Sequence, residues 1–119
     1  METRSLSPKH ADAPMVPKIG MGTSKTLDTD DLALAASVVS TALDAGTTLF
    51  DSSPMYGKAE RMLGAALGSR RSEAVVATKV WTDDDTVAEQ QIAASLTFYD
   101  GHIELLQIHN MVRWLLILH

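Results

Sequence analysis

The chain has 119 residues, of which 45% are hydrophobic and none is cysteine, and its formal net charge is -5. Ten scattered lysine and arginine residues argue against nucleic-acid binding, and the lack of cysteine excludes disulfides and thiolate metal sites. The longest apolar run, Leu115–Leu118, cannot span a bilayer. We therefore expect one globular unit in the cytoplasm, with no membrane segment and no nucleic-acid partner.

The chain is predicted to begin with a disordered leader over residues 1–14, which mix charged residues with prolines and lack an apolar stretch. A short strand or hairpin over Val16–Gly22 follows. Apolar residues then recur at helical spacing over Leu32–Leu43, behind the possible caps of Asp28–Asp31. Gly46 stands where a left-handed residue ends a helix, so a first amphipathic helix is predicted here.

Strands and helices are then predicted to alternate to the end of the chain. The expected elements are a strand over Thr47–Phe50, a helix over Lys58–Leu67, a strand over Ala74–Val80, a helix from Asp83–Asp85 through Leu96, and a strand over Ile103–His109. In the second helix Glu60 and Arg61 are expected to face outward and Gly68 to stop it. Apolar strands between amphipathic helices indicate an α/β fold with a parallel sheet.

The pattern alone leaves two parallel α/β folds open, a doubly wound sheet and a barrel. Neither the dinucleotide fingerprint G-x-G-x-x-G nor the phosphate loop G-x-x-x-x-G-K-[ST] occurs, and Gly20–Gly22 is too short a match. Both folds place their functional residues at the carboxyl ends of the strands.

Polar residues stand at three of these strand ends: Asp51, Lys79 and His109, with Tyr56 on the loop after Asp51. Singly, each has an ordinary structural role, as a turn former, a solvated lysine, a core histidine or a packing ring. Together they can converge on one edge of the sheet. His102 and His109 lack further ligands, so no metal site is predicted.

The four residues suit proton transfer to a carbonyl oxygen. A nearby ammonium favours the phenolate, so Lys79 is expected to make Tyr56 a better proton donor. Asp51 is expected to hold Lys79, and His109 to hydrogen-bond the substrate oxygen. Since no side chain supplies hydride, a reduced nicotinamide is the expected partner of a small-molecule carbonyl substrate.

The sequence resembles the aldo-keto reductases in four ordered blocks. These are Gly22–Thr23, Phe50–Glu60, Ala77–Lys79 and Leu106–Asn110. The resemblance implies a TIM barrel that binds NADPH, with Tyr56 as proton donor and Asp51, Lys79 and His109 completing a tetrad. It also implies cofactor contacts at Gly22, Thr23 and Asp51, and contact of Asn110 with substrate or carboxamide. Residues 15–119 would form the N-terminal half of this barrel, about four βα units.

The length of the chain raises a question about activity, because a whole barrel takes roughly 250 residues. Half a barrel leaves its first and fourth strands as open edges, which favour self-association. The apolar tail Trp114–His119 is expected to be a divergent or frameshifted end. One hypothesis is therefore an oxidoreductase, active when two halves or a second chain close the barrel. The alternative is a catalytically inactive fragment, or a regulatory or binding module, that retains the tetrad.

Overall fold

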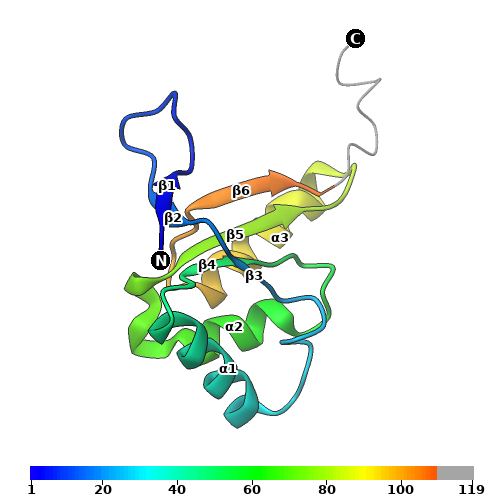
Figure 1. Cartoon of the computed structure of the whole chain (residues 1–119). Coiled ribbons are helices and arrows are strands. Elements are labelled where there is room, and N and C mark those ends of the chain that lie inside the picture. The colour runs from blue at the N-terminus through cyan, green and yellow to red at the C-terminus, as the bar shows by residue number, and fades with distance from the viewer. Residues whose placement is uncertain (110–119) are drawn as a thin grey trace.

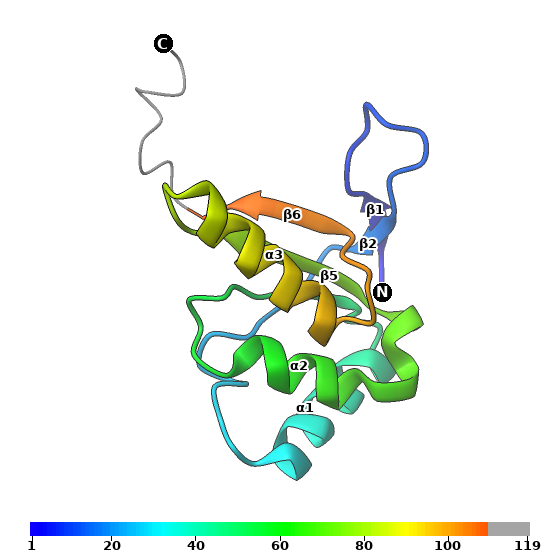
Figure 2. The same ribbon diagram turned by 180° about the vertical axis from the view of Figure 1, so that it is seen from behind.

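The fold is a four-stranded parallel sheet with three helices on one face, as a computed structural model describes it for residues 1–109 (Figure 1). The strand order is β3 (Met21–Gly22), β4 (Leu49–Asp51), β5 (Val75–Val80) and β6 (Leu105–Ile108). Each strand pairs with the next one along the chain, which is the order of successive βα units. From behind, the helices lie in front of the sheet (Figure 2).

A small antiparallel hairpin precedes the parallel sheet, where the sequence predicted a disordered leader over residues 1–14. Strand β1 (Thr3–Ser5) pairs with β2 (Met15–Pro17), and the backbone N–H of Lys18 continues the pairing by donating to the carbonyl of Glu2. Val16 and Pro17 are buried. The hairpin lies at the end of the sheet where the parallel strands begin (Figure 1). Pairing with β2 satisfies the backbone hydrogen bonds of β1, and the composition of residues 1–14 gives no sign of this pairing.

Helix α1 (Leu32–Asp44) forms where the apolar spacing predicted it. The Asp31 carboxylate caps it by accepting from the Leu34 backbone N–H at 3.0 Å. Gly46 has a φ of 84°, in the left-handed region, and the next backbone N–H returns to the carbonyl of Ala42. The helix therefore starts and stops at the residues that its sequence marks.

Helix α2 (Ala59–Leu67) and the short 3-10 helix η1 (Gly68–Glu73) join β4 to β5. The expectation that Glu60 faces outward is wrong, because its side chain is only 4% exposed. Glu60 lies on the same stripe as Leu63 and Leu67, at helical spacings of three and seven residues. Its charge suggested solvent, whereas hydrogen bonds from the neighbouring elements keep it inside.

Helix α3 (Asp85–Phe98) connects β5 to β6 and begins at Asp84, whose carboxylate accepts from the Val87 backbone N–H at 3.0 Å. The core lies between the sheet and the three helices. It comprises Leu27, Ala35, Val39, Leu43, Phe50, Ala59, Met62, Leu63, Leu67, Ala74, Val76 and Tyr99. The sequence-predicted strands and helices are thus present, with bounds shifted by one to two residues in most cases.

The sheet is open, because β3 and β6 are its two outer strands. Leu106 and Ile108 on β6 are 44% and 66% exposed. Within residues 1–109, no helix is long and apolar enough to cross a membrane, and no cluster of three or more histidine, aspartate or glutamate side chains is placed to hold a metal ion. The predictions for Asn110 and for Trp114–His119 concern residues outside the described part of the chain.

Candidate active site

The candidate site lies at the carboxyl end of the parallel sheet, on the face that the helices leave bare. Asp51 ends β4, and Lys79 lies near the end of β5 beside Gln107 of β6. Registered residues of a parallel sheet point to the same face, and alternate residues along a strand share a face. Asp51, paired with Ala77, therefore shares a face with Lys79 and Gln107, opposite to the buried Phe50, Val76 and Thr78.

Lys79 and Asp51 form the ion pair that the sequence predicted. The Lys79 Nζ donates to both carboxylate oxygens of Asp51 at 2.8 Å and to the Ser52 carbonyl, also at 2.8 Å. The Lys79 side chain is 12% exposed and that of Asp51 46% exposed. Three ammonium protons thus face three acceptors, which fixes the position of the charge and satisfies it.

Tyr56 contacts this ion pair through the face of its ring. The Lys79 Nζ lies 5.1 Å from the ring centroid, a cation–π arrangement. Since the three Lys79 protons already have acceptors, the ammonium acts on Tyr56 by its charge and not as a hydrogen-bond donor to the phenol. The positive charge of Lys79 therefore faces the electron-rich surface of the Tyr56 ring.

The loop that carries Tyr56 is held at both ends. The backbone N–H of Tyr56 donates to the carbonyl of Ser53 at 3.0 Å. Gly57 has a φ of 59°, and a Cβ there would lie 2.4 Å from an Asp28 carboxylate oxygen. That carboxylate accepts from the backbone N–H of Lys58 at 2.9 Å. Glycine is therefore required for both conformation and space, and the loop cannot easily turn Tyr56 away.

His109 completes the cluster from the end of β6. Its backbone N–H donates to the carbonyl of Val80 at 2.9 Å, which continues the pairing of β5 with β6. Its ring packs edge-on against Tyr56, with centroids 5.7 Å apart and planes at 79°. The structure thus brings Asp51, Tyr56, Lys79 and His109 together on one edge of the sheet.

The residues expected near a cofactor differ in what they expose. A Cβ at Gly22 would meet no atom within 4 Å, so the backbone there faces open space beside Asp51. Thr23 is fully buried, and its hydroxyl contacts the Asp51 carbonyl at 3.0 Å and the Ser52 hydroxyl at 2.8 Å. Its side chain therefore supports the site from within the protein. Asn110 lies outside the described residues.

Sequence reasoning missed two polar side chains of this site. The Gln107 amide donates to an Asp51 oxygen at 3.3 Å, and the buried Ser53 hydroxyl lies 2.9 Å from the Nδ1 of His109. Gln107 had a detectable signal, because it is a polar residue inside an apolar strand, two positions before His109 and hence on the same face. Ser53 had none, since a serine in a loop is ordinary.

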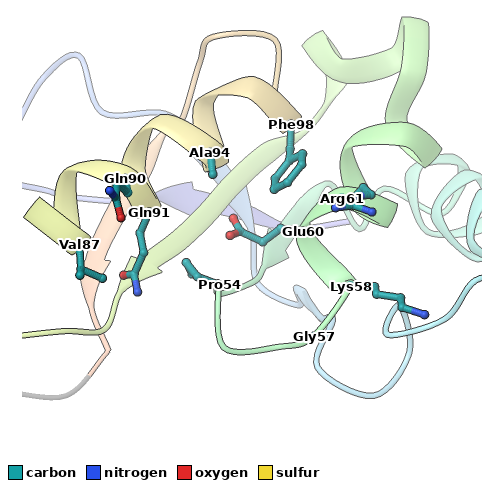
Figure 3. Close-up of a pocket in the computed structure, with 10 residues that line it drawn as sticks. All are labelled: Pro54, Gly57, Lys58, Glu60, Arg61, Val87, Gln90, Gln91, Ala94 and Phe98. Atoms are coloured by element: carbon teal, nitrogen blue, oxygen red, sulfur yellow. The ribbon is translucent and has the colours of Figure 1, made fainter.

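A second polar cluster lies on the opposite side of the sheet, in a groove between α2 and α3 of about 480 Å³. Figure 3 shows the Glu60 side chain extending into this groove, with Ala94 and Phe98 projecting from α3. Glu60 accepts from the Thr78 hydroxyl at 2.7 Å and from the Ser95 hydroxyl at 3.0 Å. This carboxylate therefore joins α2, β5 and α3, and it lies apart from the tetrad.

Comparison with known proteins identifies the family to which this chain belongs. The model of the aldo/keto reductase family matches residues 18–118. The chain belongs to this family, and its fold is part of the family's parallel barrel. An uncharacterized oxidoreductase of Mycobacterium tuberculosis is 38% identical over 81 residues, which are 64% of this chain and 25% of that protein.

Solved structures place the chain within the barrel. A Pseudomonas aeruginosa protein assigned to the aldo-keto reductases superposes with a TM-score of 0.83 and 28% identity, over 98% of this chain and 49% of that one. A Klebsiella pneumoniae aldo-keto reductase, crystallised with NADPH, shares the fold with a TM-score of 0.72 and 22% identity, over 92% of this chain and 40% of that one. The chain thus spans less than half the length of these relatives.

Proposed function

We propose that this chain supplies the proton-transfer half of an NADPH-dependent reduction of an aldehyde or ketone to an alcohol. The observation that carries the proposal is the stack of Lys79 over the Tyr56 ring, with Asp51 holding the ammonium and His109 against the ring edge. A proton donor needs charged and polar groups around it, and those that would support the Tyr56 hydroxyl lie in contact with its ring or with one another.

The chain's own residues divide the work as follows. The Tyr56 hydroxyl donates its proton to the carbonyl oxygen as that oxygen becomes an alkoxide. The ammonium of Lys79 stabilises the resulting phenolate, and Asp51 keeps the ammonium over the ring. His109 hydrogen-bonds the same oxygen and orients the carbonyl. The tyrosine is then reprotonated from solvent.

The described residues fit the nicotinamide end of the cofactor. Gly22 leaves open space beside Asp51, whose carboxylate is 46% exposed and can accept hydroxyl or amide protons. A bound NADPH would supply the hydride that reaches the carbonyl carbon. The Klebsiella relative with this fold was crystallised with NADPH. We propose Gly22 and Asp51 as contacts, with Thr23 behind them and Asn110 as a further contact.

We further propose that the bare inner face needs a second half-barrel. The edges β3 and β6 present unpaired backbone groups, and four further strands would complete an eight-stranded barrel. Self-association of two copies through these open edges would supply such strands. Closure would also exclude water from the tetrad, which strengthens its electrostatic interactions.

The test is to titrate the purified chain with NADPH, follow the nicotinamide fluorescence and measure the molecular mass in the same samples. Binding, with turnover of a small aldehyde, is the expected result for a species of at least two chains. Absence of binding by both monomer and dimer would rule out the chain as an autonomous enzyme and favour the inactive or regulatory alternative.

The role of Tyr56 is tested by replacing the hydroxyl alone. Tyr56→Phe keeps the ring under Lys79 and should abolish turnover while NADPH affinity changes little. Tyr99→Phe is the matched control, since it makes the same change to a buried ring in the core on the helix side. Turnover that survives in Tyr56→Phe would refute the proton-donor role.

A further inference from the structure

Ser53 is a buried residue whose hydroxyl lies against the candidate histidine. It is fully buried, in the loop between β4 and α2. Its Oγ accepts from the backbone N–H of Met55 at 3.2 Å and lies 2.9 Å from the Nδ1 of His109. Within residues 1–109 these are the hydrogen bonds of the hydroxyl, so both of its partners are known.

The two contacts favour one direction for the hydrogen bond between Ser53 and His109. A hydroxyl has one proton to donate and two lone pairs to accept with, and the Met55 N–H occupies one of those lone pairs. A buried O–H that donates to nothing costs about 1–3 kcal/mol. The acceptor within reach of the Ser53 proton is the Nδ1 of His109, and a nitrogen that accepts carries no proton of its own.

We propose that Ser53 is a positioning residue, whose hydroxyl donates to the His109 Nδ1 and thereby holds the ring as the tautomer protonated on Nε2. This inference rests on the proposed function for its consequence: an Nε2–H is the donor that a carbonyl oxygen needs. The opposite tautomer would place a lone pair at Nε2, which repels that oxygen. Ser53 itself touches neither substrate nor cofactor.

The same hydrogen bond fixes the direction of the ring. The backbone N–H of His109 is hydrogen-bonded to the carbonyl of Val80, and the edge-on contact with Tyr56 restricts movement of the His109 ring on one side. With Nδ1 tied to Ser53, the ring cannot turn over about its Cβ–Cγ bond, which would exchange Nδ1 with Cδ2, without losing this hydrogen bond. The geometry therefore fixes both the proton and the orientation.

The experiment is long-range proton–nitrogen NMR of the uniformly nitrogen-labelled full chain at about pH 8, above the ordinary histidine pKa of about 6.5. For His109 we expect the pattern of an Nε2–H tautomer with an Nδ1 that accepts a hydrogen bond. In Ser53→Ala the hydrogen-bonded Nδ1 shift should be lost, and the tautomer ratio should move toward that of histidine in a short peptide.

Ser52→Ala is the matched control, because Ser52 is the adjacent buried serine and its hydroxyl contacts Thr23 rather than His109. The His109 pattern should persist in Ser52→Ala and should return in Ser53→Thr, which restores a hydroxyl. The inference is overturned if wild-type His109 carries its proton on Nδ1, or if Ser53→Ala leaves the Nδ1 shift unchanged.

The spectra need no cofactor, so the tautomer inference and the proposed function fail separately. A chain that binds no NADPH but shows the Ser53-dependent pattern loses the function and keeps the inference. Where turnover is present, Ser53→Ala should lower kcat/KM about tenfold. Without Ser53 the His109 ring is misplaced part of the time, or its Nε2 carries a lone pair in place of the proton that the substrate oxygen needs. Its NADPH affinity should remain that of the wild type.

Discussion

The two ends of the parallel sheet each hold an ion pair, and the pairs differ in how far they are closed. Where the strands begin, Arg71 and Glu104 are 11% and 13% exposed, and two N–H···O contacts of 3.0 and 2.9 Å join them. Where the strands end, Lys79 is 12% exposed but Asp51 is 46% exposed. The first pair is shielded on both sides, and the second leaves a carboxylate open to a ligand.

The remaining partners of the Arg71–Glu104 pair are structural. Arg71 also donates to the carbonyls of Ala74 and Tyr99 at 3.0 Å, and Glu104 accepts the backbone N–H of Val76 at 2.8 Å. These bonds tie η1, β5 and the start of β6 together. In βα barrels the amino ends of the strands serve stability and the carboxyl ends serve chemistry. The position and closure of the Arg71–Glu104 pair agree with the structural half of this division.

The largest expected effect is that of Arg71→Met, which keeps the stem and removes the guanidinium. Glu104 would remain shielded without its cation, and four acceptor groups, three backbone carbonyls and one carboxylate, would lose their donor. Breaking such a pair from one side should lower the free energy of unfolding by about 3 kcal/mol. Urea denaturation followed by circular dichroism measures it.

The control for this variant is its neighbour in the sequence. Arg70 pairs with Glu73 and Asp44, whose side chains are 48% and 69% exposed. Arg70→Met should therefore cost much less than Arg71→Met. An equal loss of unfolding free energy in the two variants would show that the shielded Arg71–Glu104 pair contributes no more to stability than the exposed pairs of Arg70.

The Glu60 cluster gives the next largest effect. Glu60→Ala removes the acceptor of two buried hydroxyls, those of Thr78 and Ser95, and should lower the free energy of unfolding by about 2 kcal/mol. Glu60→Gln keeps one carbonyl oxygen in place and should lose less. A wild-type urea midpoint in Glu60→Ala would mean that the hydroxyls find other acceptors.

Lys79→Met should lower stability much less than Arg71→Met does. Asp51 stays half exposed and can be hydrated once its partner is gone, so we expect a loss of about 1 kcal/mol or less. The comparison of the two ends predicts this order, with Arg71→Met well above Lys79→Met. The reverse order in urea denaturation would contradict it.

The sequence predicted the elements, and the meeting of Asp51, Tyr56, Lys79 and His109 at one edge of the sheet, because both follow from local rules. Helical spacing and caps such as Asp31 set the helices, and the end of each strand marked Asp51 and Lys79. The roles of Glu60 and Ser53 escaped, since each depends on a partner at least 18 positions away. Periodicity describes one element at a time and is blind to hydrogen bonds between elements.

The smallest expected effect at neutral pH concerns Tyr99, the only described buried side chain whose polar atom has no hydrogen-bond partner. Burial raises the pKa of Tyr99, and the nearby Glu60 charge raises it further. An unpaired buried hydroxyl stabilises nothing, so Tyr99→Phe should leave the urea midpoint at pH 7 unchanged or slightly higher.

The same variant has a pH dependence with a definite sign. A tyrosine whose pKa is higher in the folded than in the unfolded state stabilises the fold fully below the unfolded value of about 10, and this contribution is lost as pH rises above it. Wild type should therefore lose stability above about pH 10, because only the unfolded chain releases the Tyr99 proton there. Tyr99→Phe should lose less over that range. An equal loss of stability above about pH 10 in the two proteins would mean that the Tyr99 hydroxyl reaches solvent, and that the core on the helix side is not closed around it.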